Sequence, residues 1–169
     1  IQRAGRDMEA VIDAFLILAR EAEIEPQAEE FELADIVLDE AENARDLLAG
    51  KPVDLRVTCN AKPRLHAPPR VMQVVVSNLL RNACRYTDAG HIDVVLEQDR
   101  IVVTDTGIGM SEDSLLRAFE PFYRADASRP NGTGLGLSIV RRLCDRFGWK
   151  IELESVLGQG TTATIRFLP

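Results

Sequence analysis

Two glycine-rich segments restrict the fold of this 169-residue chain more than any other feature. Asp105-Thr-Gly-Ile-Gly follows a predicted strand, and Gly132-Thr-Gly-Leu-Gly-Leu begins a predicted helix. Because glycine lacks a β-carbon, the first segment can turn tightly and let a flat ligand approach its backbone. The second segment can present backbone N–H groups and a helix N-terminus to a phosphate. The sequence therefore predicts a strand end and a helix start that face a ligand.

Periodicity and turn residues predict the remaining elements. The predicted helices are 5–23, 34–49, 69–86, a short one after Ser111, and 135–147, with an irregular stretch over 120–131. The predicted strands are 31–33, 53–58, 92–97, 100–105, 149–155 and 161–167, the third and fourth forming a hairpin around Gln98-Asp99. This order predicts an α+β fold, with an antiparallel-rich sheet covered by helices on one face.

Charge is distributed unevenly along the chain. Residues 1–50 hold 14 acidic and four basic side chains, which we interpret as a solvated helix face, whereas 51–169 is mildly basic and suits a phosphate ligand. No stripe of Lys and Arg alternates with aromatic residues, so we expect no nucleic-acid partner. No apolar run reaches membrane-spanning length and no signal peptide opens the chain, so we expect a cytoplasmic polypeptide that does not contact the membrane.

The first predicted helix has an apolar stripe that also fits a heptad repeat. Met8, Phe15 and Ala22 lie seven residues apart, as do Val11 and Leu18. A single helix cannot bury such a stripe alone, so it needs partner helices, from another copy of the chain. The alternative is that this helix docks on its own domain.

The predicted helix 69–86 carries a polar face. Asn78, Asn82 and Tyr86 lie at four-residue steps, with Arg85 beside them. An asparagine amide oxygen is a hard, neutral ligand for Mg²⁺. This face can therefore hold a metal, a triphosphate and, through Tyr86, an apolar ring.

The two glycine segments indicate what kind of ligand this site binds. The carboxylate of Asp105 can accept a hydrogen bond from the exocyclic amine of adenine, although a lone Asp-x-Gly-x-Gly is more often a simple turn. The spacing over 132–137 matches neither the dinucleotide-binding fingerprint nor the P-loop, so those folds are excluded. The combination predicts an ATP site.

Aromatic residues flank the loop between the two glycine segments. Phe119 and Phe122 bracket Pro121 and lead into a polar stretch, which predicts a lid that closes over a triphosphate. Arg124 or Arg129 would then reach the γ-phosphate. The alternative is that the two phenylalanines plug the core beneath an ordinary loop.

With these segments in view, residues from about 30 to 169 resemble the catalytic ATP-binding domain of sensor histidine kinases, in the family shared with gyrase, heat-shock-90 chaperones and mismatch-repair ATPases. The matching segments are 76–87, 105–110, 119–124, 132–140 and 158–162. The resemblance implies a two-layer α/β sandwich, the Bergerat-type ATP-binding fold, with a mixed, mostly antiparallel sheet. It implies two domains: 1–25, the end of the second dimerisation and phosphotransfer helix, and 26–169, the catalytic domain.

The resemblance also implies a set of site residues and the cofactors ATP and Mg²⁺. Asn82 would be the metal ligand, Arg85 would contact phosphate, Tyr86 would lie beside adenine, and Asn78 and Arg124 would be catalytic. The residues implied to bind nucleotide are Asn78, Asn82, Arg85, Tyr86, Asp105, Gly107, Ile108, Gly109, Phe122, Arg129, Gly132, Thr133, Gly134, Leu135, Gly136, Leu137 and Thr161.

The implied reaction transfers the γ-phosphoryl group of Mg-ATP to a histidine on a separate helical domain. Neither His66 nor His91 lies in an acceptor-helix motif, so we interpret both as structural and expect no autophosphorylation by this chain alone. The implied partners are the chain's own dimerisation domain, in a homodimer, and a response regulator. Inner-membrane anchoring of the full-length protein is left open. The alternatives are an anti-sigma-type serine kinase and an ATP-sensing adaptor without phosphotransfer.

Overall fold

A computed structural model describes Met8, Ile12 and residues 27–129 and 132–167. The elements follow one another in the order β1 (Glu29–Glu32), α2 (Leu33–Arg45), the 3₁₀ helix η2 (Asp46–Leu48), β2 (Val53–Cys59), β3 (Arg64–Ala67), α3 (Pro69–Tyr86), β4 (Gly90–Leu96), β5 (Arg100–Asp105), α4 (Glu112–Arg117), α5 (Gly136–Phe147), β6 (Lys150–Val156) and β7 (Gly160–Arg166). Apart from Met8 and Ile12, the helix predicted over 5–23 and its heptad stripe lie outside the described residues.

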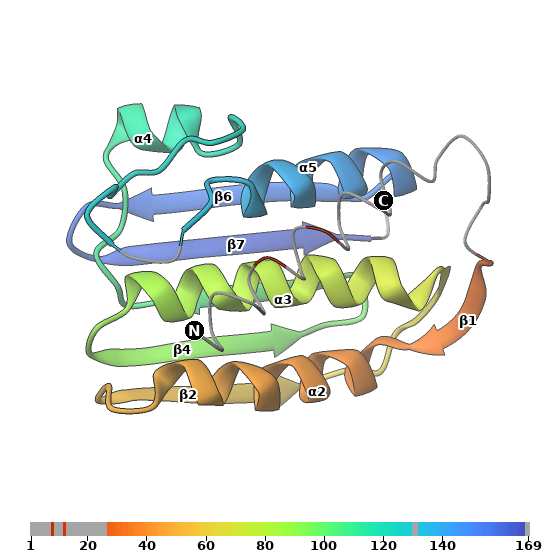
Figure 1. Cartoon of the computed structure of the whole chain (residues 1–169). Coiled ribbons are helices and arrows are strands. Elements are labelled where there is room, and N and C mark those ends of the chain that lie inside the picture. Colours follow the sequence, from red (N-terminus) through yellow and green to blue (C-terminus); the bar gives the residue numbers. More distant parts are fainter. Residues whose placement is uncertain (1–7, 9–11, 13–26, 130–131, 168–169) are drawn as a thin grey trace.

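The main sheet has five strands in the order β2-β4-β5-β7-β6. The β2–β4 pair is parallel and the other three pairs are antiparallel, which confirms the mixed, mostly antiparallel sheet. Helices α2, α3 and α5 lie across one face of it (Figure 1). The predicted hairpin is also confirmed, with Ile92 opposite Asp105 and Leu96 opposite Ile101. The result is the expected two-layer α/β sandwich.

The first strand region differs from the prediction. Strand β1 ends at Glu32, and Leu33 begins α2, where its side chain is fully buried and its N–H donates to the Pro63 carbonyl at 3.0 Å. A strand that the sequence analysis missed, β3, pairs antiparallel with β1 in a separate two-stranded sheet. Its four residues are too few to show a clear period of two, so pairing with β1 rather than local pattern defines it.

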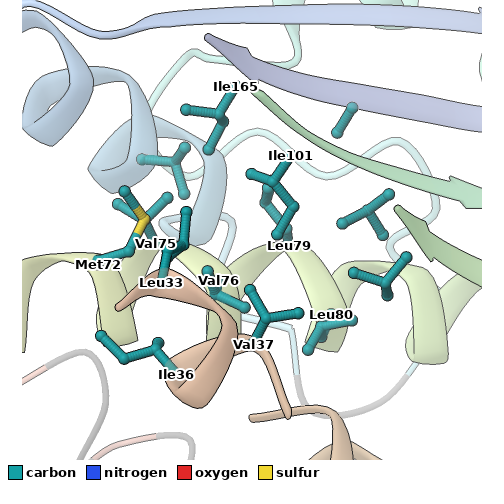
Figure 2. Close-up of a cluster of buried hydrophobic side chains, with 14 of the residues drawn as sticks. Leu33, Ile36, Val37, Met72, Val75, Val76, Leu79, Leu80, Ile101 and Ile165 are labelled. Atoms are coloured by element: carbon teal, nitrogen blue, oxygen red, sulfur yellow. The ribbon is translucent and has the colours of Figure 1, made fainter. Parts of the chain in front are cut away.

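The core forms where α3 packs onto the middle of the sheet, with α2 beside it over the edge strand β2 (Figure 2). Val75 and Leu79 of α3 lie with Ile101 of β5 and Ile165 of β7, all of them at most 3% exposed. Burying each such side chain stabilises the fold by about 1.5–3 kcal/mol. This packing fixes the rotation of α3, and therefore the direction of the polar face that carries Asn78.

The C-terminal end of α3 is capped by three other segments rather than by a glycine. Its last carbonyls have no partners within the helix. Lys51 Nζ donates to the carbonyls of Cys84 (2.8 Å) and Thr87 (3.1 Å). Arg129 Nη1 donates to the Arg85 carbonyl (2.8 Å), and Ile108 N–H donates to the Tyr86 carbonyl (3.0 Å). Two of these donors are cationic, which suits the negative end of a helix dipole.

Candidate functional site

A pocket opens between α3, the inner face of the sheet and the loop that leads into α5. It brings together residues 78–86, 103–110, 118–125 and 132–137 with residues of β6 and β7. The predicted site residues that line it are Asn78, Asn82, Arg85, Tyr86, Asp105, Gly109, Arg124, Gly132, Thr133, Gly134, Gly136, Leu137 and Thr161. The helix face, both glycine segments, Arg124 of the predicted lid and Thr161 of β7 therefore contribute to one cavity.

Five predicted residues do not line this pocket: Gly107, Ile108, Phe122, Arg129 and Leu135. Phe122 is 73% exposed, whereas Phe119 packs against the core beneath the Arg141 guanidinium, which lies 4.4 Å from its ring centroid. The alternative prediction, that these phenylalanines pack into the core beneath the loop, is therefore confirmed for Phe119 and wrong for Phe122. Leu135 also packs against the core.

The loop between Phe122 and Gly134, which contains the predicted lid, is closed at its base. Phe122 N–H donates to the Gly134 carbonyl at 2.8 Å. Phe122 has a positive φ of 65°, and a β-carbon on Gly134 would lie 2.5 Å from the Phe122 carbonyl carbon. Backbone contact therefore holds the start and the end of this segment together.

The glycines of the first segment are required by packing against protein backbone. A β-carbon on Gly107 would lie 2.2 Å from Tyr86 O, and one on Gly109 would lie 2.1 Å from Val156 O. Ile108 is held on both sides, because its N–H donates to Tyr86 and its carbonyl accepts from Gly158 N–H at 2.7 Å. The segment is thus clamped between the end of α3 and the β6–β7 turn.

Ser155 joins three parts of the site, and the sequence analysis missed it. Its hydroxyl accepts from Met110 N–H at 2.8 Å, donates to the Gly160 carbonyl at 2.9 Å, and lies 2.8 Å from the Thr161 hydroxyl. It therefore fixes Thr161 relative to the glycine segment. An alternation argument would have placed Ser155 on the inner face of β6, two residues after Leu153.

The apolar lining was also missed. Val103, Leu153 and Ala163 line the pocket from three adjacent strands, together with Met110. Val103 lies two residues before Asp105, and Ala163 two residues after Thr161, so each shares a sheet face with a predicted site residue. This surface can pack against a flat apolar ring.

Asp105 is a buried carboxylate at the apolar end of the pocket. Its side chain accepts a hydrogen bond from Gly107 N–H at 2.9 Å, and the residue is 8% exposed. Burial raises the pKa of the Asp105 carboxyl above its ordinary value, whereas hydrogen bonds from the backbone of Gly107 and Thr161 oppose that rise. A buried carboxylate with spare acceptor capacity favours a ligand that donates a hydrogen bond.

The other end of the pocket presents two amide oxygens beside a helix N-terminus. Asn78 Nδ2 donates to the Val74 carbonyl at 2.8 Å, which directs Oδ1 away from its own helix. A β-carbon on Gly136 would lie 3.0 Å from Asn78 Oδ1 and 3.9 Å from Asn82 Oδ1. This glycine therefore brings the N-terminus of α5 next to both oxygens, an arrangement suited to a cation and a phosphate.

Arginines surround this polar end. Arg81, Arg85 and Arg124 line the pocket. Arg124 Nη2 donates to the Arg129 carbonyl, while its buried Nε has no hydrogen-bond partner in the part of the chain that the structure describes. A buried guanidinium donor without an acceptor fits an anionic ligand.

The ligand atoms that the described residues offer limit how this chain could hold a metal ion. Among residues 27–129 and 132–167, no group of three or more His, Cys, Asp or Glu side chains could hold a metal ion. A cation in this pocket would therefore depend on the amide oxygens and on a phosphate ligand. His66 and His91 lie elsewhere, beside Glu30 (3.9 Å) and Asp93 (3.4 Å) respectively.

Residues 67–169 match the family described as histidine kinase-, DNA gyrase B-, and HSP90-like ATPases. The chain belongs to this ATPase family. Membership implies ATP binding, which agrees with a pocket that has an apolar, carboxylate-bearing end and a cationic end. No helix in the described part of this family member is long and apolar enough to cross a membrane.

Its relatives are sensor kinases. PhoR of Pseudomonas aeruginosa, a phosphate regulon sensor protein, is 36% identical over 99% of this chain and 40% of its own length. The sensor histidine kinase RppB of a Synechocystis species is 35% identical over 98% of this chain and 39% of its own length. A crystal structure of full-length ShkA in complex with AMPPNP matches with a TM-score of 0.79 and 26% identity, over 94% of this chain and 35% of ShkA. The chain thus spans about two fifths of its curated relatives.

The clamp on the first glycine segment predicts which glycine of the β6–β7 turn is needed for stability. Gly160 has φ +110°, and its β-carbon would lie 1.9 Å from the Asp105 carbonyl, whereas Gly158 has φ +81° and a β-carbon there would meet no atom within 4 Å. Gly160→Ala is expected to lower the free energy of unfolding by about 3 kcal/mol, and Gly158→Ala by about 1 kcal/mol. Urea unfolding measures both, and equal losses would contradict the clamp.

The burial of Asp105 predicts a pH dependence of stability. The folded carboxyl has a raised pKa, so its contribution is fully present below the unfolded pKa of about 3.9 and is lost as the pH rises through the folded pKa. The amide in Asp105→Asn stays neutral. The unfolding free energy of the wild type minus that of this variant should therefore fall as the pH rises above the unfolded pKa of about 3.9. A rising difference in urea titrations would refute the assigned direction.

Proposed function

We propose that this chain is the ATP-binding catalytic part of a two-component sensor histidine kinase. It would transfer the γ-phosphoryl group of Mg-ATP to a histidine on a separate helical domain. The observation that carries the proposal is the placement of Asn78 and Asn82 oxygens beside the N-terminus of α5, in the same pocket as the buried Asp105. The sensor histidine kinases among its relatives support it.

At the apolar end, the side chains suit adenine. Asp105 would accept a hydrogen bond from the exocyclic amine, and Thr161 would be held beside it by Ser155. Val103 and Ala163 would pack against the ring, with Tyr86 at its side. Guanine carries an oxygen where adenine carries the amine, so a carboxylate acceptor here would select ATP.

At the polar end, the chain would hold the triphosphate. Asn82 would ligate Mg²⁺, with Asn78 near both metal and phosphate, and Arg85 and Arg124 would contact phosphate oxygens. Backbone N–H groups over 132–137 would add further donors. Bound Mg-ATP supplies the γ-phosphoryl group, from which an acceptor imidazole nitrogen displaces ADP. These residues would orient the γ-phosphoryl group and stabilise its charge.

Asn78 would favour transfer to an imidazole over hydrolysis. Related ATPases use a glutamate at this position as a general base for water, and an amide cannot accept a proton. Hydrolysis by this chain should therefore be slow. An imidazole nitrogen brought by another domain has its own lone pair and needs no such base.

The partners follow from the same proposal. Residues 1–25 would be the end of a dimerisation and phosphotransfer helix, and residues 26–169 the catalytic domain. The full-length protein would act as a homodimer and pass the phosphoryl group to a response regulator. The serine kinase and the adaptor remain the competing hypotheses, which the next experiment separates.

A transfer assay tests the reaction. The chain, labelled ATP and a dimeric acceptor hairpin supplied in trans should give acid-labile label on the acceptor histidine, and a hairpin without that histidine is the control. Acid-stable label would indicate a serine kinase instead. Absence of any label, while the intact full-length kinase labels its own histidine, would contradict the transfer role of this chain.

Removing the metal ligand tests the polar end. Asn82→Ala should weaken binding of a non-hydrolysable ATP analogue about tenfold with Mg²⁺ and leave affinity in EDTA unchanged, because only the metal-bridged contact is lost. Asn60→Ala is the matched control, since Asn60 is an exposed amide that donates to Glu97. Titration calorimetry measures both. A loss that persists undiminished in EDTA would rule out the metal role.

A further inference from the structure

The guanidinium of Arg129 is engaged at the end of α3 rather than in the pocket. It makes a two-pronged ion pair with Asp88, with Nη1–Oδ1 at 2.9 Å and Nη2–Oδ2 at 2.8 Å. Nη1 also donates to the Arg85 carbonyl at 2.8 Å, and Nε donates to Asp126 at 3.2 Å. The side chain is only 18% exposed. Its donors are therefore committed to protein acceptors, which leaves little capacity for a phosphate.

Asp88 connects this arginine to a second cation. Lys51 Nζ lies 3.7 Å from Asp88 Oδ1 and donates to two carbonyls at the end of α3. The hydrogen bond from Arg129 lowers the pKa of Asp88, so the carboxylate stays charged near neutral pH. Forty-one residues separate Asp88 from Arg129 in the sequence, so this pair ties the lid to the helix.

The same contacts place the lid next to the adenine end. The Arg129 guanidinium carbon lies 5.8 Å from the centroid of the Tyr86 ring, and Tyr86 lines the pocket. Arg124, five residues earlier, lines the pocket itself and keeps a buried Nε without an acceptor among the described residues. The two lid arginines therefore occupy different environments.

We propose that Asp88 and Arg129 are positioning residues that anchor the lid segment 124–129 to the end of α3, and that Arg124 is the lid arginine that meets phosphate. This inference rests on the proposed nucleotide site and assigns Arg129 a role other than the phosphate contact predicted from sequence. The anchor holds the lid beside adenine, a part common to ATP and ADP. Loss of the anchor therefore weakens both nucleotides alike, whereas loss of Arg124 weakens ATP more than ADP.

The experiment compares Asp88→Asn and Arg129→Gln, singly and together, with a control of the same chemistry. Asp93→Asn is that control, because Asp93 forms a two-pronged pair with Arg56 (2.7 and 3.0 Å) and lies outside the pocket. Hydrogen exchange of the amides over 125–129 is measured without nucleotide. Titration calorimetry with ADP and a non-hydrolysable ATP analogue follows, and Arg124→Gln is included.

We expect Asp88→Asn to speed exchange over 125–129 about fivefold and to weaken both nucleotides by a similar factor of about three to five. The double variant should lose less than the sum of the two single losses, because both single variants break the same Asp88–Arg129 pair. Arg124→Gln should raise the Kd of the ATP analogue at least about tenfold more than that of ADP. Asp93→Asn should change none of these quantities.

Two results would overturn the anchor. One is exchange over 125–129 that is equal in Asp88→Asn and Asp93→Asn. The other is an effect of Asp88→Asn on the ATP analogue alone, or tighter binding of either nucleotide. Failure of the wild type to bind any adenine nucleotide would refute the proposed site instead, and the exchange measurement would still test the anchor.

Discussion

The last carbonyls of α3, which accept hydrogen bonds from outside the helix, organise the whole site. A helix that ends at a buried pocket must find donors for these groups, because a buried acceptor without a partner costs about 1–3 kcal/mol. Here the donors come from Lys51 before β2, from Ile108 in the first glycine segment and from Arg129 in the lid. Satisfying one helix end therefore draws three distant segments to the same place.

The two ends of the pocket are built by different means. The apolar end depends on backbone packing, with Gly107, Gly109 and Gly160 each too close to a neighbouring carbonyl for a side chain. The polar end depends on side chains and a helix N-terminus, with Asn78 and Arg124 lining the pocket near Gly136 and Gly132. The first end is fixed by backbone contacts, whereas the second is formed mainly by side chains.

Much of this arrangement could be predicted from the sequence. The 3.6-residue period identified α3 and α5, and four-residue steps placed Asn78, Asn82 and Tyr86 on one face. Alternation identified the β4–β5 hairpin. These features are local, so their patterns repeat within a few residues and are visible in the sequence.

Other features depend on contacts between segments and leave no local signal. The pairing of β3 with β1 and the Asp88–Arg129 pair join residues more than thirty positions apart. The glycines of 105–109 indicated a close approach, but not that protein backbone fills the space beside them. Phe122 is apolar yet exposed. Its positive φ and its hydrogen bond to Gly134 fix the backbone in a conformation that leaves the side chain outside the core.

The contact between Phe122 and Gly134 has a consequence for how relatives of this chain can diverge. It closes the intervening stretch at its base, so residues added or removed there need not disturb the strands and helices on either side. Closing a loop of twice the length costs only about 0.6 kcal/mol more. Insertions and deletions in this stretch that lie outside residues 124–129 should therefore be tolerated during evolution, while the base of the loop keeps its glycine.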